Sequence, residues 1–323
     1  FRRQDLLLLV WVDDILIAGS EETSIEWAKT QLKKEFDMTD MGELSYFLGI
    51  QFKFAQNEVR MDQSNYLTKV LERFGMTNCK PRHTPCDQNL KFSGNADPVE
   101  ETLYRGIVGS MIYLMTCTRP DICWVVTKLS QFLSKPTTEH YACAKQVLRY
   151  LNGTRNCELV YRKSTEPLLI CGNADSDWAG SEDRKSISGH CFKLNNNSAV
   201  VTWKSKKQNT IALSSCEAEY MSLTLAVQEG LFLIQLMTDM QPNCIFDHFC
   251  LSGDNQGSIA LAKNPVQHKR SKHVDVKFHF IREHVKSGKV ILSYVPSYDN
   301  DADVFTKSVG KVIFKRCVEK LFA

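Results

Sequence analysis

The apolar residues near the start of the chain form short β-type runs, followed by one helical pattern. The runs LLLLVWV and ILIAG within residues 6–19 meet at Asp13 and Asp14, which predicts a β-hairpin with both carboxylates at its turn. Residues 24–36 place apolar side chains at helical spacing, and residues 46–62 predict two strands around a polar turn. A buried charge without a partner is costly, so these two carboxylates require one, and divalent cations prefer carboxylate oxygens.

The helical period dominates the next part of the chain, as far as Gly153. It predicts four helices, with a proline-containing loop between the first and the second. Pro120 lies in the first turn of the third helix, where proline is tolerated because no backbone N–H is needed there. Together the four helices predict a small bundle. They cover residues 64–75, 101–117, 120–135 and 137–153.

The last part of the chain alternates strands and helices. Three strands precede a long helix over residues 214–237, and a fourth strand, two helices, a fifth strand and a final helix over residues 301–309 follow. This order predicts an α/β domain of ordinary size. The segments we expect are residues 1–62, 63–162 and 163–310, followed by a C-terminal tail, residues 311–323.

Composition narrows the class of protein only slightly. Of the 323 residues, 43% are hydrophobic and 24% charged, as in ordinary globular proteins, and the net charge of +3 permits nucleic-acid binding without arguing for it. We find no uninterrupted apolar run near the roughly 18 residues of a membrane span, so we expect no membrane partner. The twelve cysteines show no zinc-type spacing, which favours free thiols.

Carboxylates recur at the strand ends and helix starts of the last segment. Asp175 and Asp177 end its first strand, Asp254 ends the fourth, Glu217 opens the long helix and Asp303 opens the final helix. Strand ends and helix starts meet at one edge of an open sheet, which is the usual place for a site. Carboxylates that converge there can hold two divalent cations roughly 4 Å apart, the arrangement that hydrolyses phosphodiesters.

Each of these acids also has a structural explanation. Ser214 and Glu217 fit a capping box at the start of the long helix, and we weigh this about equally with a metal-binding role for Glu217. Glu219 lies two residues further on, so we expect it on the opposite, solvated helix face. The aspartates fit ordinary turn positions or a helix N-terminus. These local explanations do not account for the regular placement of all the acids together.

Several long motifs resemble, in chain order, the Pol polyprotein of copia-type LTR retrotransposons. GNADSDWAGSEDRKSISG, SSCEAEY, DNQGSIAL and DADVFTKSV resemble its ribonuclease H domain, and VWVDDILIAG, MGELSYFLGIQF, YRGIVGSMIYLM and AKQVLRYLNGT resemble its reverse transcriptase. The resemblance covers nearly the whole chain. It implies an α/β fold class: an α+β palm remnant and a helical thumb, followed by a ribonuclease H-like mixed-sheet domain.

The resemblance also implies roles for the acids. In that family a Mg²⁺-dependent ribonuclease H degrades the RNA strand of RNA–DNA hybrids, with two ions in the site and Mn²⁺ as a substitute. Matched by position, the metal-binding and catalytic acids of the nuclease would be Asp175, Glu217, Asp254 and Asp303.

In the first segment, Asp13 and Asp14 resemble the paired catalytic, metal-binding acids of the polymerase palm. Polymerase chemistry needs a further aspartate from another strand, and in the family that residue lies upstream of the hairpin. The pair is therefore half of a site, and we expect DNA polymerase activity only with the upstream palm and fingers. The chain opens at Phe1 in what looks like mid-domain, so we expect a fragment of a longer polypeptide.

Two basic stretches are candidates for contacts with nucleic acid. WKSKKQ offers an aromatic surface and phosphate contacts, with a solvated strand edge as an equally weighted alternative, and HKRSKH is the densest basic cluster. The residues concerned are Trp203, Lys204, Lys206, Lys207, Lys269, Arg270 and Lys272.

The partners implied are an RNA–DNA hybrid, template–primer nucleic acid and the remainder of the Pol polyprotein. The implied location is cytoplasmic, within a virus-like particle, with the nucleus as the alternative. A different class of function also fits the chain: a catalytically silent retroelement remnant that at most binds nucleic acid. No acid of the last segment is lost, which favours the enzyme.

Overall fold

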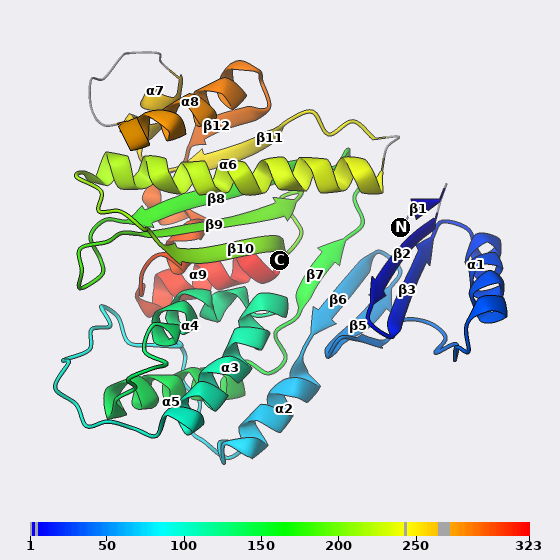
Figure 1. Ribbon diagram of the computed structural model, residues 1–323, viewed down its shortest axis with the longest axis horizontal. Helices are drawn as coiled ribbons and strands as arrows, with labels where there is room; N and C mark the ends of the chain where they lie inside the picture. The colour runs from blue at the N-terminus through cyan, green and yellow to red at the C-terminus, as the bar shows by residue number, and fades with distance from the viewer. Residues whose placement is uncertain (1, 4–5, 242–243, 264–271) are drawn as a thin grey trace.

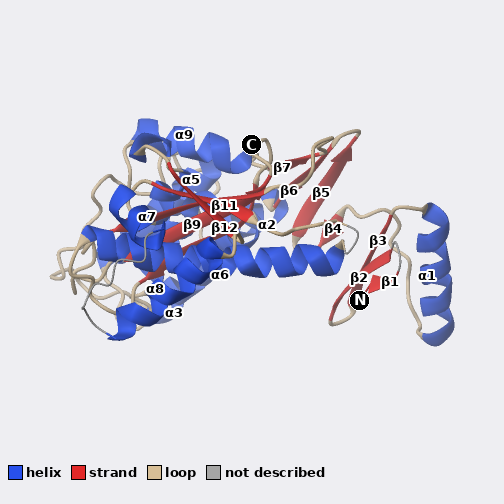
Figure 2. Cartoon of the chain, turned by 90° about the horizontal axis from the view of Figure 1, so that it is seen from above, coloured by secondary structure: helices blue, strands red, loops and turns tan. Residues whose placement is uncertain are grey.

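Three sheets and the helices around them make up the protein (Figures 1 and 2). One sheet lies at the N-terminal end, one joins the N-terminal and middle parts of the chain, and the third forms the centre of the last part. The computed structural model describes the backbone of residues 2–3, 6–241, 244–263 and 272–323, and the side chains of these residues except 2–3 and 272–278.

The predicted hairpin with the Asp13–Asp14 pair is confirmed. Trp11 pairs with Asp14 across the two strands, so Val12 and Asp13 form the turn. The helix that follows lies against the second strand of the hairpin, at the edge of the molecule (Figure 1). The elements of this region are β1 (Arg2–Arg3), β2 (Leu6–Trp11), β3 (Asp14–Gly19) and α1 (Glu22–Glu35).

The second sheet joins two distant parts of the sequence. Its last strand comes about a hundred residues after its third, and it pairs antiparallel with that strand. The sheet therefore crosses the boundary that we expected between residues 1–62 and 63–162. Its strands are β4 (Tyr46–Phe47), β5 (Ile50–Ala55), β6 (Glu58–Asp62) and β7 (Leu159–Arg162).

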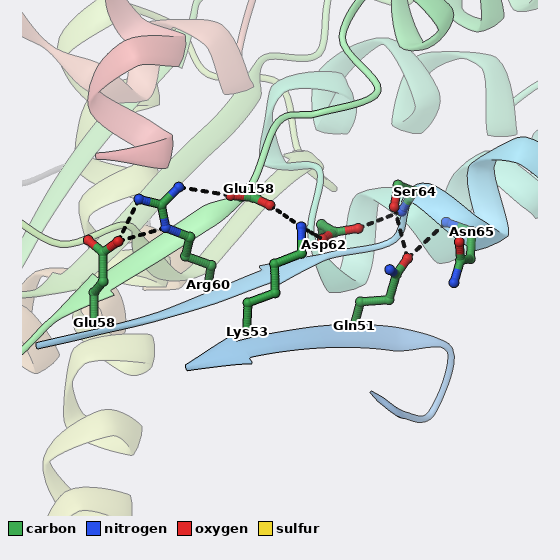
Figure 3. Close-up of polar contacts among 8 residues, drawn as sticks. All are labelled: Gln51, Lys53, Glu58, Arg60, Asp62, Ser64, Asn65 and Glu158. Atoms are coloured by element: carbon green, nitrogen blue, oxygen red, sulfur yellow. Dashed lines mark hydrogen bonds and ion pairs between the residues drawn. The ribbon is translucent and has the colours of Figure 1, made fainter. Parts of the chain in front are cut away.

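Alternating charges on one face of this sheet tie its strands together (Figure 3). Lys53 of β5 lies 3.0 Å from Asp62 of β6 and also contacts Glu158, which directly precedes β7. Arg60 of β6 lies 3.2 Å from the same Glu158 carboxylate and also pairs with Glu58. Opposite charges on neighbouring strands stabilise that pairing, so this network supports the return of the chain to the sheet.

The helical bundle follows the predicted pattern, except that the third helix is shorter and begins as a 3₁₀ turn. Its interior holds a buried ion pair, in which Arg119 Nη2 lies 2.6 Å from Asp121 Oδ2. The Tyr150 hydroxyl donates to the same carboxylate oxygen, so the buried charge is both paired and hydrogen-bonded. The elements are α2 (Ser64–Arg73), α3 (Glu101–Cys117), η1 (Pro120–Ile122), α4 (Cys123–Ser130) and α5 (Thr138–Gly153).

The third sheet has the strand order β10-β9-β8-β11-β12. Its first three strands are antiparallel, and β11 and β12 continue parallel to β8, which is the mixed sheet that the ribonuclease H resemblance implies. The elements are β8 (Ile170–Asp177), β9 (Ile187–Leu194), β10 (Val200–Lys207), α6 (Ser215–Met240), β11 (Phe249–Gly253), α7 (Gln256–Lys263), α8 (Lys272–Lys286) and β12 (Val290–Tyr294).

Helix α6 packs across one face of this sheet (Figure 1). A Cβ atom at Gly230 would lie 2.4 Å from the ring of Phe249 on β11, so only glycine permits this close approach. By length and composition α6 is also apolar enough to cross a membrane, although the sequence shows no uninterrupted apolar run of that size. Half of its most apolar 18-residue window is buried inside the protein, as in a core helix.

The opposite face of the sheet carries the C-terminal elements, which differ from our expectations. Within residues 301–309, Asp301–Phe305 form a 3₁₀ turn in place of the expected α-helix, and the expected tail, residues 311–323, contains a helix over Lys311–Phe322. Phe314, Cys317 and Leu321 of this helix are buried in a core shared with the bundle. Their helical spacing was visible in the sequence. The elements are η2 (Ser297–Asp299), η3 (Asp301–Phe305) and α9 (Lys311–Phe322).

Candidate functional site

Three of the predicted acids meet at one edge of the third sheet. Asp175 belongs to β8, Asp254 directly follows β11 and Asp303 belongs to η3. One carboxylate oxygen from each lies within 4.8 Å of the other two. The strands β8 and β11 are parallel neighbours, so their carboxyl ends open at the same edge. The predicted convergence of these three acids is confirmed.

Hydrogen bonds to the backbone hold the acid-bearing elements in register. The Ser222 hydroxyl of α6 donates to the carbonyl oxygen of Asp175 at 2.6 Å. The buried Asn300 side chain donates to the carbonyl oxygen of Ala174 at 3.0 Å and thereby ties the segment before Asp303 to β8. The Thr306 hydroxyl donates to the Asp175 carboxylate itself. The acids are therefore carried by a rigid frame.

Burial disfavours the charged forms of Asp175 and Asp303. Asp175 is 2% exposed and Asp303 is 7% exposed. Burial raises the pKa of Asp175, and burial together with the charge of Asp175 raises the pKa of Asp303 to about 6. The Lys307 ammonium lies 3.0 Å from Asp303 Oδ1 and 3.7 Å from Asp175 Oδ2, and it opposes both shifts. The cluster is therefore a site of closely spaced carboxyl groups with one cation, Lys307, beside two of them.

Glu219, and not Glu217, is the glutamate that the fold brings to these aspartates. Glu219 is 8% exposed, and burial, followed by the charges of Asp175 and Asp254, raises its pKa to about 9. The Glu217 carboxylate instead accepts the backbone N–H of Leu213 at 2.8 Å. Our expectation that Glu219 faces solvent is wrong, and Glu217 takes the capping role that we weighed against metal binding.

The capping interactions explain why Glu219, and not Glu217, lies beside the aspartates. The Ser214 hydroxyl accepts the backbone N–H of Glu217 at 3.1 Å, which directs the side chain of Glu217 back toward the preceding loop. The face of α6 that carries Glu219 packs on the sheet, and Ala218, Tyr220 and Met221 beside it are buried too. The sequence therefore carried a signal for this outcome. If Glu217 caps the helix, Glu219 is the glutamate that remains available for the site.

The donor set of the cluster fits Mg²⁺ or Mn²⁺. Its ligand atoms are carboxylate oxygens, which hard divalent cations select. Asp303 Oδ1 is buried, and the Lys307 ammonium at 3.0 Å marks the position beside it as one that a cation can take. Asp177, at the end of β8, is half-buried and stands outside the three-aspartate group.

The hairpin acids occupy a different environment. Asp13 and Asp14 are both exposed at the turn, beside the exposed side chains of Trp11 and Val12. Val12 has a φ of +50°, a backbone conformation that β-branched residues rarely adopt. Among the residues that the structure describes, no third acid joins this pair in a metal-type group.

The proposed nucleic-acid residues fall into three situations. Trp203 is half-buried and donates its indole N–H to the carbonyl oxygen of Met115 at 2.8 Å, whereas Lys204 and Lys206 are exposed on β10. Lys207 pairs with Asp183 at 2.9 Å. Lys269 and Arg270 lie outside the described residues, and Lys272 starts α8 with its side chain outside the description.

Comparisons with known proteins agree with this architecture. A family model described as reverse transcriptase (RNA-dependent DNA polymerase) matches residues 1–88. The Retrovirus-related Pol polyprotein from transposon TNT 1-94 of Nicotiana tabacum is 37% identical over 97% of this chain. The transposon Ty5-1 protein of Saccharomyces cerevisiae is 31% identical over 69% of this chain and 73% of its own length.

The chain spans about a quarter of the tobacco polyprotein, 24% of its length. Among solved structures, the foamy viral protease-reverse transcriptase in complex with RNA/DNA hybrid aligns with a TM-score of 0.52 and 14% sequence identity. The alignment covers 94% of this chain and 37% of that one. At this identity the alignment shows a shared fold.

Proposed function

The chain belongs to the family of copia-type retrotransposon Pol polyproteins, and on this premise we propose that it is a Mg²⁺-dependent ribonuclease H acting on RNA–DNA hybrids. The reaction is endonucleolytic hydrolysis of the RNA strand that leaves a 3′-hydroxyl. The observation that carries the proposal is the convergence of Asp175, Asp254 and Asp303 within 4.8 Å at one sheet edge.

Four acids of the cluster carry this proposal. Asp175, Asp254 and Asp303 hold the metal, and Glu219 takes the place that the sequence assigned to Glu217. Mg²⁺ held by these acids would supply activation of water and stabilisation of the leaving oxygen. The Ser222 hydroxyl on the Asp175 carbonyl oxygen and the Thr306 hydroxyl on the Asp175 carboxylate hold this side chain in one orientation.

The first segment gives the protein a polymerase-related half. Its Asp13–Asp14 hairpin and family match support RNA-directed DNA polymerase activity only in a longer polypeptide that supplies a third acid. The proposed partners are therefore template–primer nucleic acid, the RNA–DNA hybrid and the rest of Pol. The proposed location is the cytoplasm, within virus-like particles, or the nucleus. Lys204 and Lys206, which are exposed on β10, are the described cations that we propose for phosphate contacts.

Cleavage of a labelled RNA–DNA hybrid by the purified chain with Mg²⁺ tests the proposal. We expect cleavage by the wild type and none by Asp175→Asn, whose folding is checked by circular dichroism. Asp13→Asn is the matched control, because it removes one carboxylate from the exposed hairpin and should cleave normally. A folded wild type that leaves the hybrid intact would contradict the proposal.

The rival is a silent remnant that binds nucleic acid without cleaving it. Its supporting observation is that the Asp13–Asp14 pair has no third acid among the described residues. Binding of the hybrid without cleavage, by a wild type that Mg²⁺ does not stabilise against heat, would favour the remnant.

A further inference from the structure

Lys307 lies inside the acid cluster. Its ammonium is 3.0 Å from Asp303 Oδ1 and 3.7 Å from Asp175 Oδ2. Both carboxylates are almost completely buried, whereas the Lys307 side chain is 38% exposed. The cation therefore bridges the two acids from the solvent side.

This contact differs from an ordinary surface ion pair. Surface pairs contribute little because water screens them, but the carboxylates of Asp175 and Asp303 are removed from water and lie close together. Asp303 Oδ1 accepts no hydrogen bond within the described residues, so the ammonium is the charge that compensates it. Removing the lysine would leave two like charges buried side by side.

The same oxygens are the ones that a metal ion needs. An ammonium and a divalent cation on the same carboxylates would be only a few ångströms apart, where like charges repel strongly in a buried site. We propose that Lys307 is the protein's own counter-ion for Asp175 and Asp303 in the metal-free state, and that Mg²⁺ displaces its ammonium on binding. The inference rests on the proposed function, because it takes this cluster to be the metal site.

The surroundings of Lys307 allow such an exchange. It follows η3 by two residues, four positions after Asp303, so the ammonium reaches the carboxylate from the same turn of chain. Its side chain also borders a small cavity lined by Trp124 and Val304, while its exposed part faces water. Rotation of the side chain toward solvent frees both carboxylates without moving the backbone.

Lys320 is a closely matched control. Its side chain is 39% exposed, and its ammonium lies 3.1 Å from Asp301 Oδ1, on the same η3 segment. Asp301 stands outside the three-aspartate group. Lys320→Met therefore removes a comparable ion pair without touching the proposed metal site.

The test measures Mg²⁺ binding by titration calorimetry and thermal unfolding with and without Mg²⁺, on the full chain at one fixed pH. Removing the competing ammonium in Lys307→Met should tighten Mg²⁺ binding by about tenfold. Lys307→Met should also have a lower melting temperature than the wild type in EDTA. At saturating Mg²⁺ its melting temperature should equal that of the wild type. Lys320→Met should lower the melting temperature under both conditions with unchanged Mg²⁺ affinity.

The charge-conserving Lys307→Arg should keep the wild-type stability in EDTA, and Lys307→Gln replaces Lys307→Met if the latter does not fold. Unchanged or weaker Mg²⁺ binding in the neutral variants would overturn the inference while leaving the nuclease proposal intact. A wild type that binds no Mg²⁺ would overturn both the inference and the nuclease proposal. Measuring cleavage of the hybrid separates failure of the inference alone from failure of both.

Discussion

The two carboxylate sites of this protein show opposite solutions to the same problem. The pair Asp13–Asp14 stands exposed at a hairpin turn, where water solvates its charges. Asp175 and Asp303 are buried at the edge of a sheet, and Lys307, Thr306 and the frame around them compensate their charges. Both sites were visible as acids in an apolar context.

The difference teaches that a run of apolar residues does not determine burial by itself. Leu9, Val10 and Trp11 of the hairpin are all about half exposed, although the sequence of β2 is more apolar than that of β8. Burial at β8 comes from α6 on one face and from η3 on the other. At the enclosed site burial raises the pKa of Asp175 and Asp303, and the Lys307 ammonium lies beside both carboxylates.

The largest expected effect concerns the two glutamates at the start of α6. Loss of even an outer partner of a metal site costs about 10–100-fold in activity, so Glu219→Gln, which removes an acid of the cluster itself, should reduce hybrid cleavage by about 100-fold or more. Glu217→Gln should retain cleavage within about threefold, because its side chain only caps the helix. Turnover rates of both variants on the labelled hybrid are the measurement. Equal losses of cleavage activity in the two variants would contradict the assignment of Glu219 to the site and of Glu217 to the helix cap.

A second test uses the pH dependence of the enclosed region. His190 on β9 is 2% exposed, and burial, aided by the charge of Lys204, lowers its pKa to about 4. The unfolded chain binds this proton near the ordinary pKa of 6.5, so stability falls as the pH drops from about 6.5 to 4, by about 3 kcal/mol in total.

Denaturant unfolding of the wild type and His190→Leu between pH 4 and 7 measures this contribution. The variant should lose less stability toward acid than the wild type does. The exposed His83 supplies the control, since His83→Leu should leave the wild-type slope unchanged. Identical slopes for wild type and His190→Leu would show that the imidazole is protonated within the folded protein.

The smallest expected effect compares the response of the two acid sites to Mg²⁺. At about 30 times its dissociation constant, Mg²⁺ should stabilise the wild type by about 2 kcal/mol. Asp254→Asn should lose this stabilisation, and Asp14→Asn should keep it, because the exposed pair lacks a third acid among the described residues. Thermal unfolding with and without Mg²⁺ measures both. A loss in Asp14→Asn would assign a metal to the hairpin.

The sequence by itself determined the local elements and the positions of the acids. The hairpin around Asp13 and Asp14, helices α3 and α5 and the order of strands in the last segment all follow from apolar spacing. The resemblance to copia-type Pol polyproteins came from motif order, and the relatives confirm it. These features are encoded within windows of ten to twenty residues, so no distant contact is needed to read them.

Only the tertiary structure decided which side chains share a site. Four features depend on contacts with distant parts of the chain. They are the pairing of β7 with β6, the burial of α9, the position of Glu219 rather than Glu217 at the site, and the contact of Lys307 with two aspartates. Spacing along a helix says that Glu217 and Glu219 point in different directions, but not which direction meets the sheet. The capping box and the packing of α6 make that choice, because burial is a property of the assembled layers.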